Sequence, residues 1–190
     1  MRALTGAAAR RLLAGMLLIT TSACGGAPVG SGAFAGMPLP ELPKLPRIQA
    51  RDALDLLAGH TFACSGPTPD PAVPMVRHVC EAVGSDADTT ATSRAVIEGS
   101  PDGSDVFTII GEVAIRSGRP DDDFIVGLCG NILGSLPFAE PAIPDLIPWV
   151  AEHVGTPTSG QWGTVMVDLA GPPHLRRCVI AGLSDAAIVR

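Results

Sequence analysis

Short runs in which hydrophobic and polar residues alternate recur along the middle of the chain. This alternation is typical of strands with one face against a core. It predicts strands over residues 60–65, 75–83, 92–99 and 105–116. The last two runs flank Ser100-Pro101-Asp102-Gly103-Ser104, a turn sequence, so we expect them to form a hairpin.

Residues 161–171 and 174–183 form another pair of apolar runs, on either side of Pro172-Pro173. They are expected to be the two strands of a closing hairpin, because a pair of prolines ends a strand and favours a turn.

Three other stretches have the spacing of helices. Residues 47–59 form a short amphipathic pattern that ends at Gly59. From Phe124 to Leu136 the apolar residues follow the rhythm of a core helix, and the acidic run 121–123 suits its N-terminal dipole. A third helix is expected around 147–154. Long antiparallel strands with helices predict an α+β fold, an antiparallel β-sheet with helices packed on one face.

The first 23 residues have a different composition. Arg2, Arg10 and Arg11 precede a short apolar run, Leu12–Ile19, which is followed by small residues. The apolar run is much shorter than the about 20 residues that cross a membrane. This layout is that of a secretory signal.

Thr21-Ser22-Ala23-Cys24 at the end of this segment resembles the lipobox of bacterial lipoproteins, although an aliphatic residue is commoner than Thr21 at its position. The resemblance implies that the Cys24 thiol receives a diacylglycerol and that Cys24 then becomes the first residue, with an N-acyl lipid such as palmitate. It also implies a protein anchored by this lipid on the outer, extracytoplasmic face of the cell membrane. The alternative is an ordinary secretory signal that happens to contain a cysteine.

These features divide the chain into three parts. Residues 1–23 are the expected signal peptide, and 24–46 are the lipidated cysteine and a tether rich in Gly and Pro. Residues 47–190 contain no further linker of this kind and are expected to form one globular α+β domain.

Four cysteines remain when Cys24 is set aside, an even number that suits an oxidising compartment. Cys64 and Cys80 fall in consecutive predicted strands, so a bond between them would close a hairpin. Cys129 lies on the apolar side of the core helix, and Cys178 lies in the last strand. Of the three possible connectivities, we predict 64–80 with 129–178. Free buried thiols are the alternative.

Charge and composition exclude several function classes. The net charge is −6, and it becomes −9 without residues 1–23, whose only charged residues are three arginines. Such an acidic domain is unsuited to nucleic acid. The four histidines are scattered and no Cys-x-x-Cys occurs, so we expect no metal site and no cofactor beyond the lipid. Gly182-Leu183-Ser184-Asp185-Ala186 imitates a nucleophile elbow, but too few residues follow it. No catalytic residue is therefore assigned.

The most consistent interpretation is a membrane-anchored, non-catalytic binding or interaction module of the cell envelope, with an envelope protein as its partner. Two alternatives stay open. One is an envelope hydrolase whose active-site residues are dispersed in the sequence, and the other is a carrier of an apolar small molecule. A binding module should expose an apolar or charged patch, whereas a hydrolase should show convergent polar groups.

Overall fold

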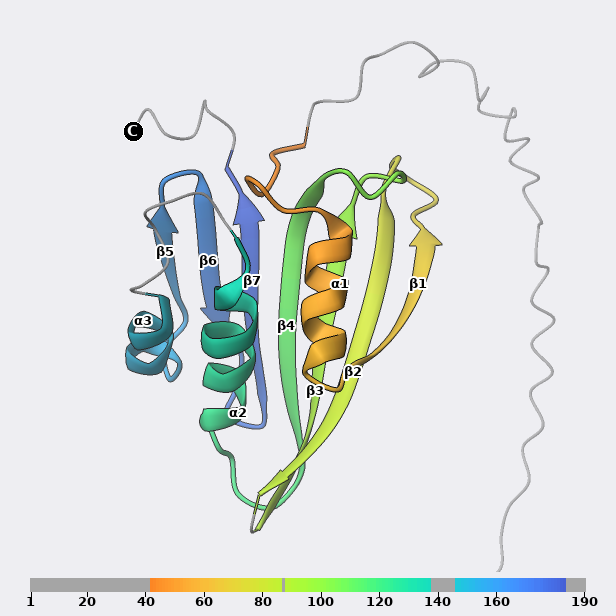
Figure 1. Ribbon diagram of the computed structural model, residues 1–190. Coiled ribbons are helices and arrows are strands. Elements are labelled where there is room, and N and C mark those ends of the chain that lie inside the picture. The colour runs from red at the N-terminus through yellow and green to blue at the C-terminus, as the bar shows by residue number, and fades with distance from the viewer. Residues whose placement is uncertain (1–41, 87, 138–145, 184–190) are drawn as a thin grey trace, which may run out of the picture. The chain divides into compact units, whose positions relative to one another are not determined.

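A seven-stranded antiparallel sheet is the main element of the computed structural model, which describes residues 42–86, 88–137 and 146–183 (Figure 1). The strand order is β1-β2-β3-β4-β7-β6-β5. The strands are β1 (Ala63–Pro69), β2 (Val76–Asp86), β3 (Thr89–Gly99), β4 (Val106–Ser117), β5 (Thr158–Trp162), β6 (Val165–Ala170) and β7 (Leu175–Gly182). The expected signal peptide and Cys24 lie outside the described residues.

The helices are α1 (Ala50–Gly59), a helical segment made of α2 (Asp123–Ile125), η1 (Val126–Ile132) and η2 (Leu133–Ser135), and α3 (Leu146–His153). The three predicted helices are therefore confirmed. In the middle segment, η1 is a π-helix and η2 a 3₁₀-helix. A mixture of helical types was not predicted.

Most strands lie where the alternation of residues predicts them, but the expected single strand over 161–171 is wrong. The structure has two strands there, β5 and β6, which pair with each other across a turn at Gly163-Thr164. The reason is local: Gly163 has a φ of 58°, a left-handed conformation that reverses the chain and that glycine adopts without strain.

One face of the sheet contributes to a continuous hydrophobic core. Alternate residues of the central strands are buried there, among them Ile97, Ile109, Val113 and Ile180. The same core cluster includes buried side chains from every described helix, such as Leu57 of α1, Leu128 of η1 and Val150 of α3. We call this the core face. Figure 1 draws α1 and α2 in front of the strands.

Two disulfides have the predicted connectivity. Cys64–Cys80 joins directly paired residues of β1 and β2, and Cys129–Cys178 joins η1 to β7. The second bond crosses β4 at Gly111, where a Cβ atom would lie 2.9 Å from both Cys129 Sγ and Cys178 Sγ. Only glycine leaves room for this disulfide in the core.

The glycines of the middle helical segment have two different surroundings. Gly130 and Gly134 face α3, where a Cβ would lie 3.4 Å from Ile147 Cα and 3.3 Å from Leu146 Cδ2. The backbone of α3 thus approaches closely at Gly130, whereas at Gly134 the neighbour from α3 is the Leu146 side chain. At Gly127 nothing lies within 4 Å of such a Cβ.

We expect Gly111→Ala to lower the free energy of unfolding by about 1–3 kcal/mol, the usual cost of overpacking a core. The reason is the contact of the added methyl with both sulfurs. Urea unfolding at constant pH measures it. Gly127→Ala is the matched control, because the added methyl meets no atom, and a helical alanine costs less than glycine by about 1 kcal/mol. Equal stability losses in the two variants would contradict the close contact at Gly111.

Candidate functional site

A hollow of about 570 Å³ lies between α1 and the turn that joins β3 to β4. One wall comes from residues 49–55 and another from residues 101–104. Pro67 of β1 and Val76 and His78 of β2 complete the lining. We call it the turn groove. It combines apolar side chains with several polar ones, as ligand sites commonly do.

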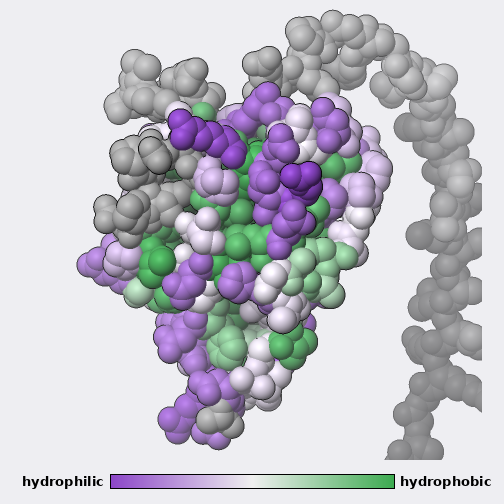
Figure 2. All heavy atoms as spheres, in the orientation of Figure 1, coloured by the Kyte–Doolittle hydropathy of each residue, from purple (hydrophilic) through white to green (hydrophobic). Residues whose placement is uncertain are grey.

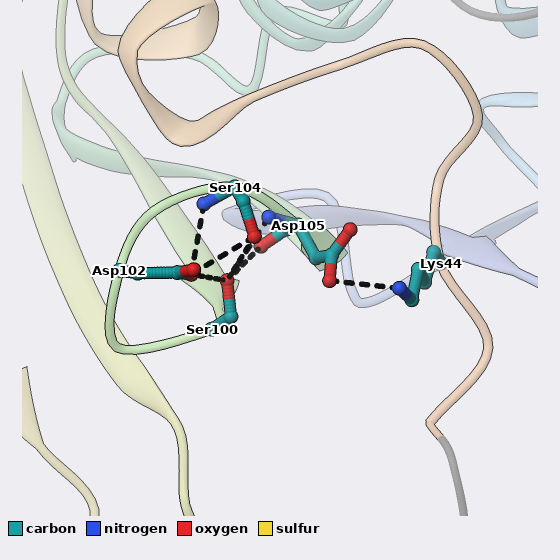
Figure 3. A network of polar contacts seen from close by, with 5 residues as sticks. All are labelled: Lys44, Ser100, Asp102, Ser104 and Asp105. Carbon is teal, nitrogen blue, oxygen red and sulfur yellow. Dashed lines mark hydrogen bonds and ion pairs between the residues drawn. The ribbon is translucent and has the colours of Figure 1, made fainter.

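Hydrogen bonds within the β3–β4 turn hold one wall of the groove (Figure 3). Asp102 Oδ1 accepts bonds from Ser100 Oγ at 2.6 Å, from Ser104 Oγ at 2.9 Å and from Ser104 N at 3.1 Å. Ser100 Oγ in turn accepts a bond from Asp105 N at 3.0 Å. The turn predicted at Ser100–Ser104 is thus confirmed, with its side chains closing the loop.

These hydrogen bonds change the acidity of Asp102. The Ser100 hydroxyl, followed by the backbone N–H and hydroxyl of Ser104, lowers the pKa of Asp102 to about 2. Bonds donated to the carboxylate favour its charged form. Asp102 therefore brings a lasting negative charge to the groove wall at any physiological pH.

The turn is also tied to the segments around it. Ala50 N, in the first turn of α1, donates to Gly103 O at 3.1 Å. The Lys44 ammonium forms an ion pair with Asp105 Oδ2 at 2.8 Å, and Leu45 N donates to Val106 O at 2.7 Å (Figure 3). The two walls of the groove, α1 and the β3–β4 turn, are therefore fixed to one another before any ligand binds. This lowers the entropy cost of binding.

The opposite wall carries a pair of charges that balance each other. Arg51 Nε lies 3.9 Å from Asp55 Oδ2 on α1, and both side chains are exposed, at 81% and 77%. Such a pair contributes little to stability. The charges of Arg51, Asp55 and Asp102, which line the groove, sum to one negative charge.

A second groove of about 380 Å³ lies at the other end of α1. Its lining is more apolar and includes Phe62, Phe124, Leu128 and Ile132, with Gly127 beside them. Figure 2 shows hydrophobic residues gathered in the middle of the face on which α1 and α2 are drawn. We call this second hollow the apolar groove.

His60 and His78 lie in different hollows. His60 lines the apolar groove, whereas His78 lines the turn groove. Of the neighbouring basic residues His174, Arg176 and Arg177, the two arginines form ion pairs within the chain. Arg177 Nε lies 3.7 Å from Glu112 Oε1.

Arg176 is buried, with 9% of its side chain exposed, and donates to both oxygens of Asp122, at 2.8 and 3.3 Å. It also donates to Gly171 O. The two acidic residues before α2 are thus explained: Asp122 holds β7, and Asp121 Oδ1 accepts a bond from Asp123 N at 2.9 Å. Asp121 therefore binds a backbone N–H at the start of α2, and Asp123 lies in its first turn.

Within residues 42–86, 88–137 and 146–183, no group of three or more metal-ligating side chains occurs. None of the helices in these ranges is long and apolar enough to cross a membrane. No protein-family model matches the chain, and neither a curated protein nor a solved structure matches it significantly.

The turn predicts a pH-dependent stability. The pKa of Asp102 falls from 3.8 to about 2 on folding, so its ionised form stabilises the fold above pH 4 and this contribution disappears as the pH falls toward 2. Asp102→Asn should lower the midpoint of thermal unfolding at pH 7 and have a much smaller effect at pH 2, where half of the folded Asp102 is already protonated. Circular dichroism melts across this range measure the difference.

Asp55→Asn is the control, because Asp55 is exposed and its ionic partner among the described residues, Arg51, is 3.9 Å away. Its midpoint should follow that of the unsubstituted protein at every pH. A deficit in Asp102→Asn that stays constant down to pH 2 would show that the hydrogen bonds do not depend on the ionised carboxylate.

Proposed function

We propose that the chain is an extracytoplasmic lipoprotein, anchored at Cys24, whose globular domain is a non-catalytic binding module of the cell envelope. Two described disulfides support the extracytoplasmic side, since such bonds persist in oxidising compartments. They use Cys64, Cys80, Cys129 and Cys178, so Cys24 has no intramolecular partner among these cysteines and suits the lipid attachment that its sequence context implies.

We propose the turn groove as the binding site. The observation that carries this is a wall already fixed by the hydrogen bonds of Asp102, which hold a negative charge beside apolar surface. We assign to it an extended segment of a partner protein that carries a lysine or arginine, because a cationic side chain complements this charge. We also propose that the helices cover only one face of the sheet, the core face, as the sequence predicts.

The anchor is tested by intact mass. Protein expressed in a bacterium and extracted from its membranes should begin at Cys24 and carry the mass of a diacylglycerol and an N-acyl chain. Cys24→Ser is the control, which should appear without lipid and outside the membrane fraction. A chain that begins at Ala27 or later and carries no lipid would overturn the proposal.

The groove is tested by titrating the full chain with tetralysine and recording backbone amide NMR spectra. We expect shifts concentrated at residues 49–55 and 101–104, and none there with tetraglutamate. Asp102→Asn should weaken binding about threefold, the effect of one exposed ion pair. Asp123→Asn, which removes a carboxylate from the apolar groove instead, is the matched control and should leave the affinity unchanged.

Two results would count against the turn groove. One is the absence of any local shift with tetralysine. The other is a set of shifts at residues 124–132 on addition of palmitate, because these residues line the apolar groove. The second result would favour the alternative function, a carrier of an apolar small molecule.

A further inference from the structure

The second face of the sheet, opposite the core face, carries charges in alternating order. Strand register places one residue from each of four adjacent strands in a row, which we call the charged row: Glu81 of β2, Arg94 of β3, Glu112 of β4 and Arg177 of β7. Neighbours in the row are ion-paired, with nitrogen to oxygen distances of 3.6, 3.3 and 3.7 Å. The order of charges from β2 to β7 is thus negative, positive, negative, positive.

Two apolar rows flank the charged row on the same four strands. The inner row lies two residues from the charged row on each strand and consists of Val79, Val96, Ile110 and Val179. The outer row, on the other side, is Val83, Thr92, Ala114 and Leu175. Val83 and Leu175, at its two ends, have exposed fractions of 75% and 45% and are two of the four large hydrophobic residues that are exposed in the described part of the chain.

A two-fold axis parallel to the strands, above the gap between β3 and β4, makes this face complementary to itself. It places β2 of one copy opposite β7 of the other, and β3 opposite β4. In the charged row, Glu81 then meets Arg177 of the second copy, and Arg94 meets Glu112. Opposite charges face each other at all four positions, which is the arrangement that an isologous interface requires.

The same axis also places apolar residues opposite one another in the two apolar rows. This match is independent of the charged row. Exposed Val83 meets exposed Leu175 of the second copy in the outer row. In the inner row, Val79 meets Val179 and Val96 meets Ile110. Val96 is only 5% exposed although it lies outside the core cluster, so the contact in this row would come mainly from the other three residues.

Arg94 is under-bonded in the single chain. Its Nε is buried and has no hydrogen-bond partner among the described residues, since Glu81 Oε1 at 3.6 Å is too far for one. Because Nε is buried, a carboxylate from outside the chain reaches only the terminal nitrogens of this guanidinium, where it would add a second acidic partner. The axis brings Glu112 of the second copy to that place.

We propose that two copies of this chain associate face to face through these rows, as a symmetric dimer with its axis between β3 and β4. Two sheets packed in this way lie about 10 Å apart with aligned strands. The six adjacent strands that run across the sheet from β1 to β6, about 4.8 Å apart, present roughly 700 Å² over about seven residues of each strand. This approaches the about 800 Å² that each partner buries in a standard interface.

Sedimentation equilibrium of the full chain with Cys24→Ser, which carries no lipid, tests the dimer. Arg94→Glu alone should weaken the dimer at least tenfold, because it brings two carboxylates together across the axis. Glu112→Arg alone should do the same with two guanidinium groups. An equimolar mixture of the two variants should dimerise again, because each copy then presents the charge that the other lacks.

The mixture separates the interface from the ion pairs inside each chain, which stay broken in both variants. Val83→Asp provides a second measurement, since this exposed side chain has no core role, and it should also weaken the dimer at least tenfold. Arg51→Glu, the same charge reversal on α1, is the control and should leave the dimer unchanged. A chain that stays monomeric at all concentrations up to about 1 mM would overturn the proposal, because even a dimer of millimolar affinity would be detected there. Failure of the mixture to dimerise would also overturn it.

Discussion

The disulfide between Cys129 and Cys178 holds the helical segment against the centre of the sheet, and the rest of the structure depends on that contact. It crosses β4 at Gly111, with both sulfurs too close for any larger residue. Its loop of 49 residues gives it about 4 kcal/mol in the chain-entropy model. On the same side, Asp122 before α2 holds buried Arg176 of β7. Covalent and ionic links therefore fix one helix and one strand at two points.

The positions of the two grooves follow from this fixed helical segment. The apolar groove lies where Phe124 and Leu128 are held at a distance from Phe62 beyond the end of α1. The turn groove lies at the other end of α1, where Ala50 contacts the β3–β4 turn through a backbone hydrogen bond. Both hollows are thus consequences of how α1 sits on a sheet whose other half is occupied by the disulfide-linked segment.

Much of the fold was predictable because strand alternation and helical spacing are local signals. The disulfide pairs followed from cysteines that lie in consecutive strands or on an apolar helix face. The turn at Gly163 was not predicted, because the apolar residues on both sides of it have the pattern of one continuous strand. The turn groove was missed as well, because its walls come from residues 49–55, 76–78 and 101–104, which only the fold brings together. Its one local signal was Ser100, Asp102 and Ser104. These residues predict a turn, but they do not indicate that the turn forms one wall of a groove.

The first strand of the sheet has a consequence for solubility. An edge strand exposes unpaired backbone groups and can recruit a strand from another molecule, which leads to aggregation. In β1 two prolines, Pro67 and Pro69, lack the backbone donor that such recruitment needs, and the register shifts between Ser65 and Thr68. Cys64, bonded to Cys80, keeps this irregular strand in place. The protein thus protects its edge against uncontrolled fibrillar pairing by covalently fastening a strand that is a poor template.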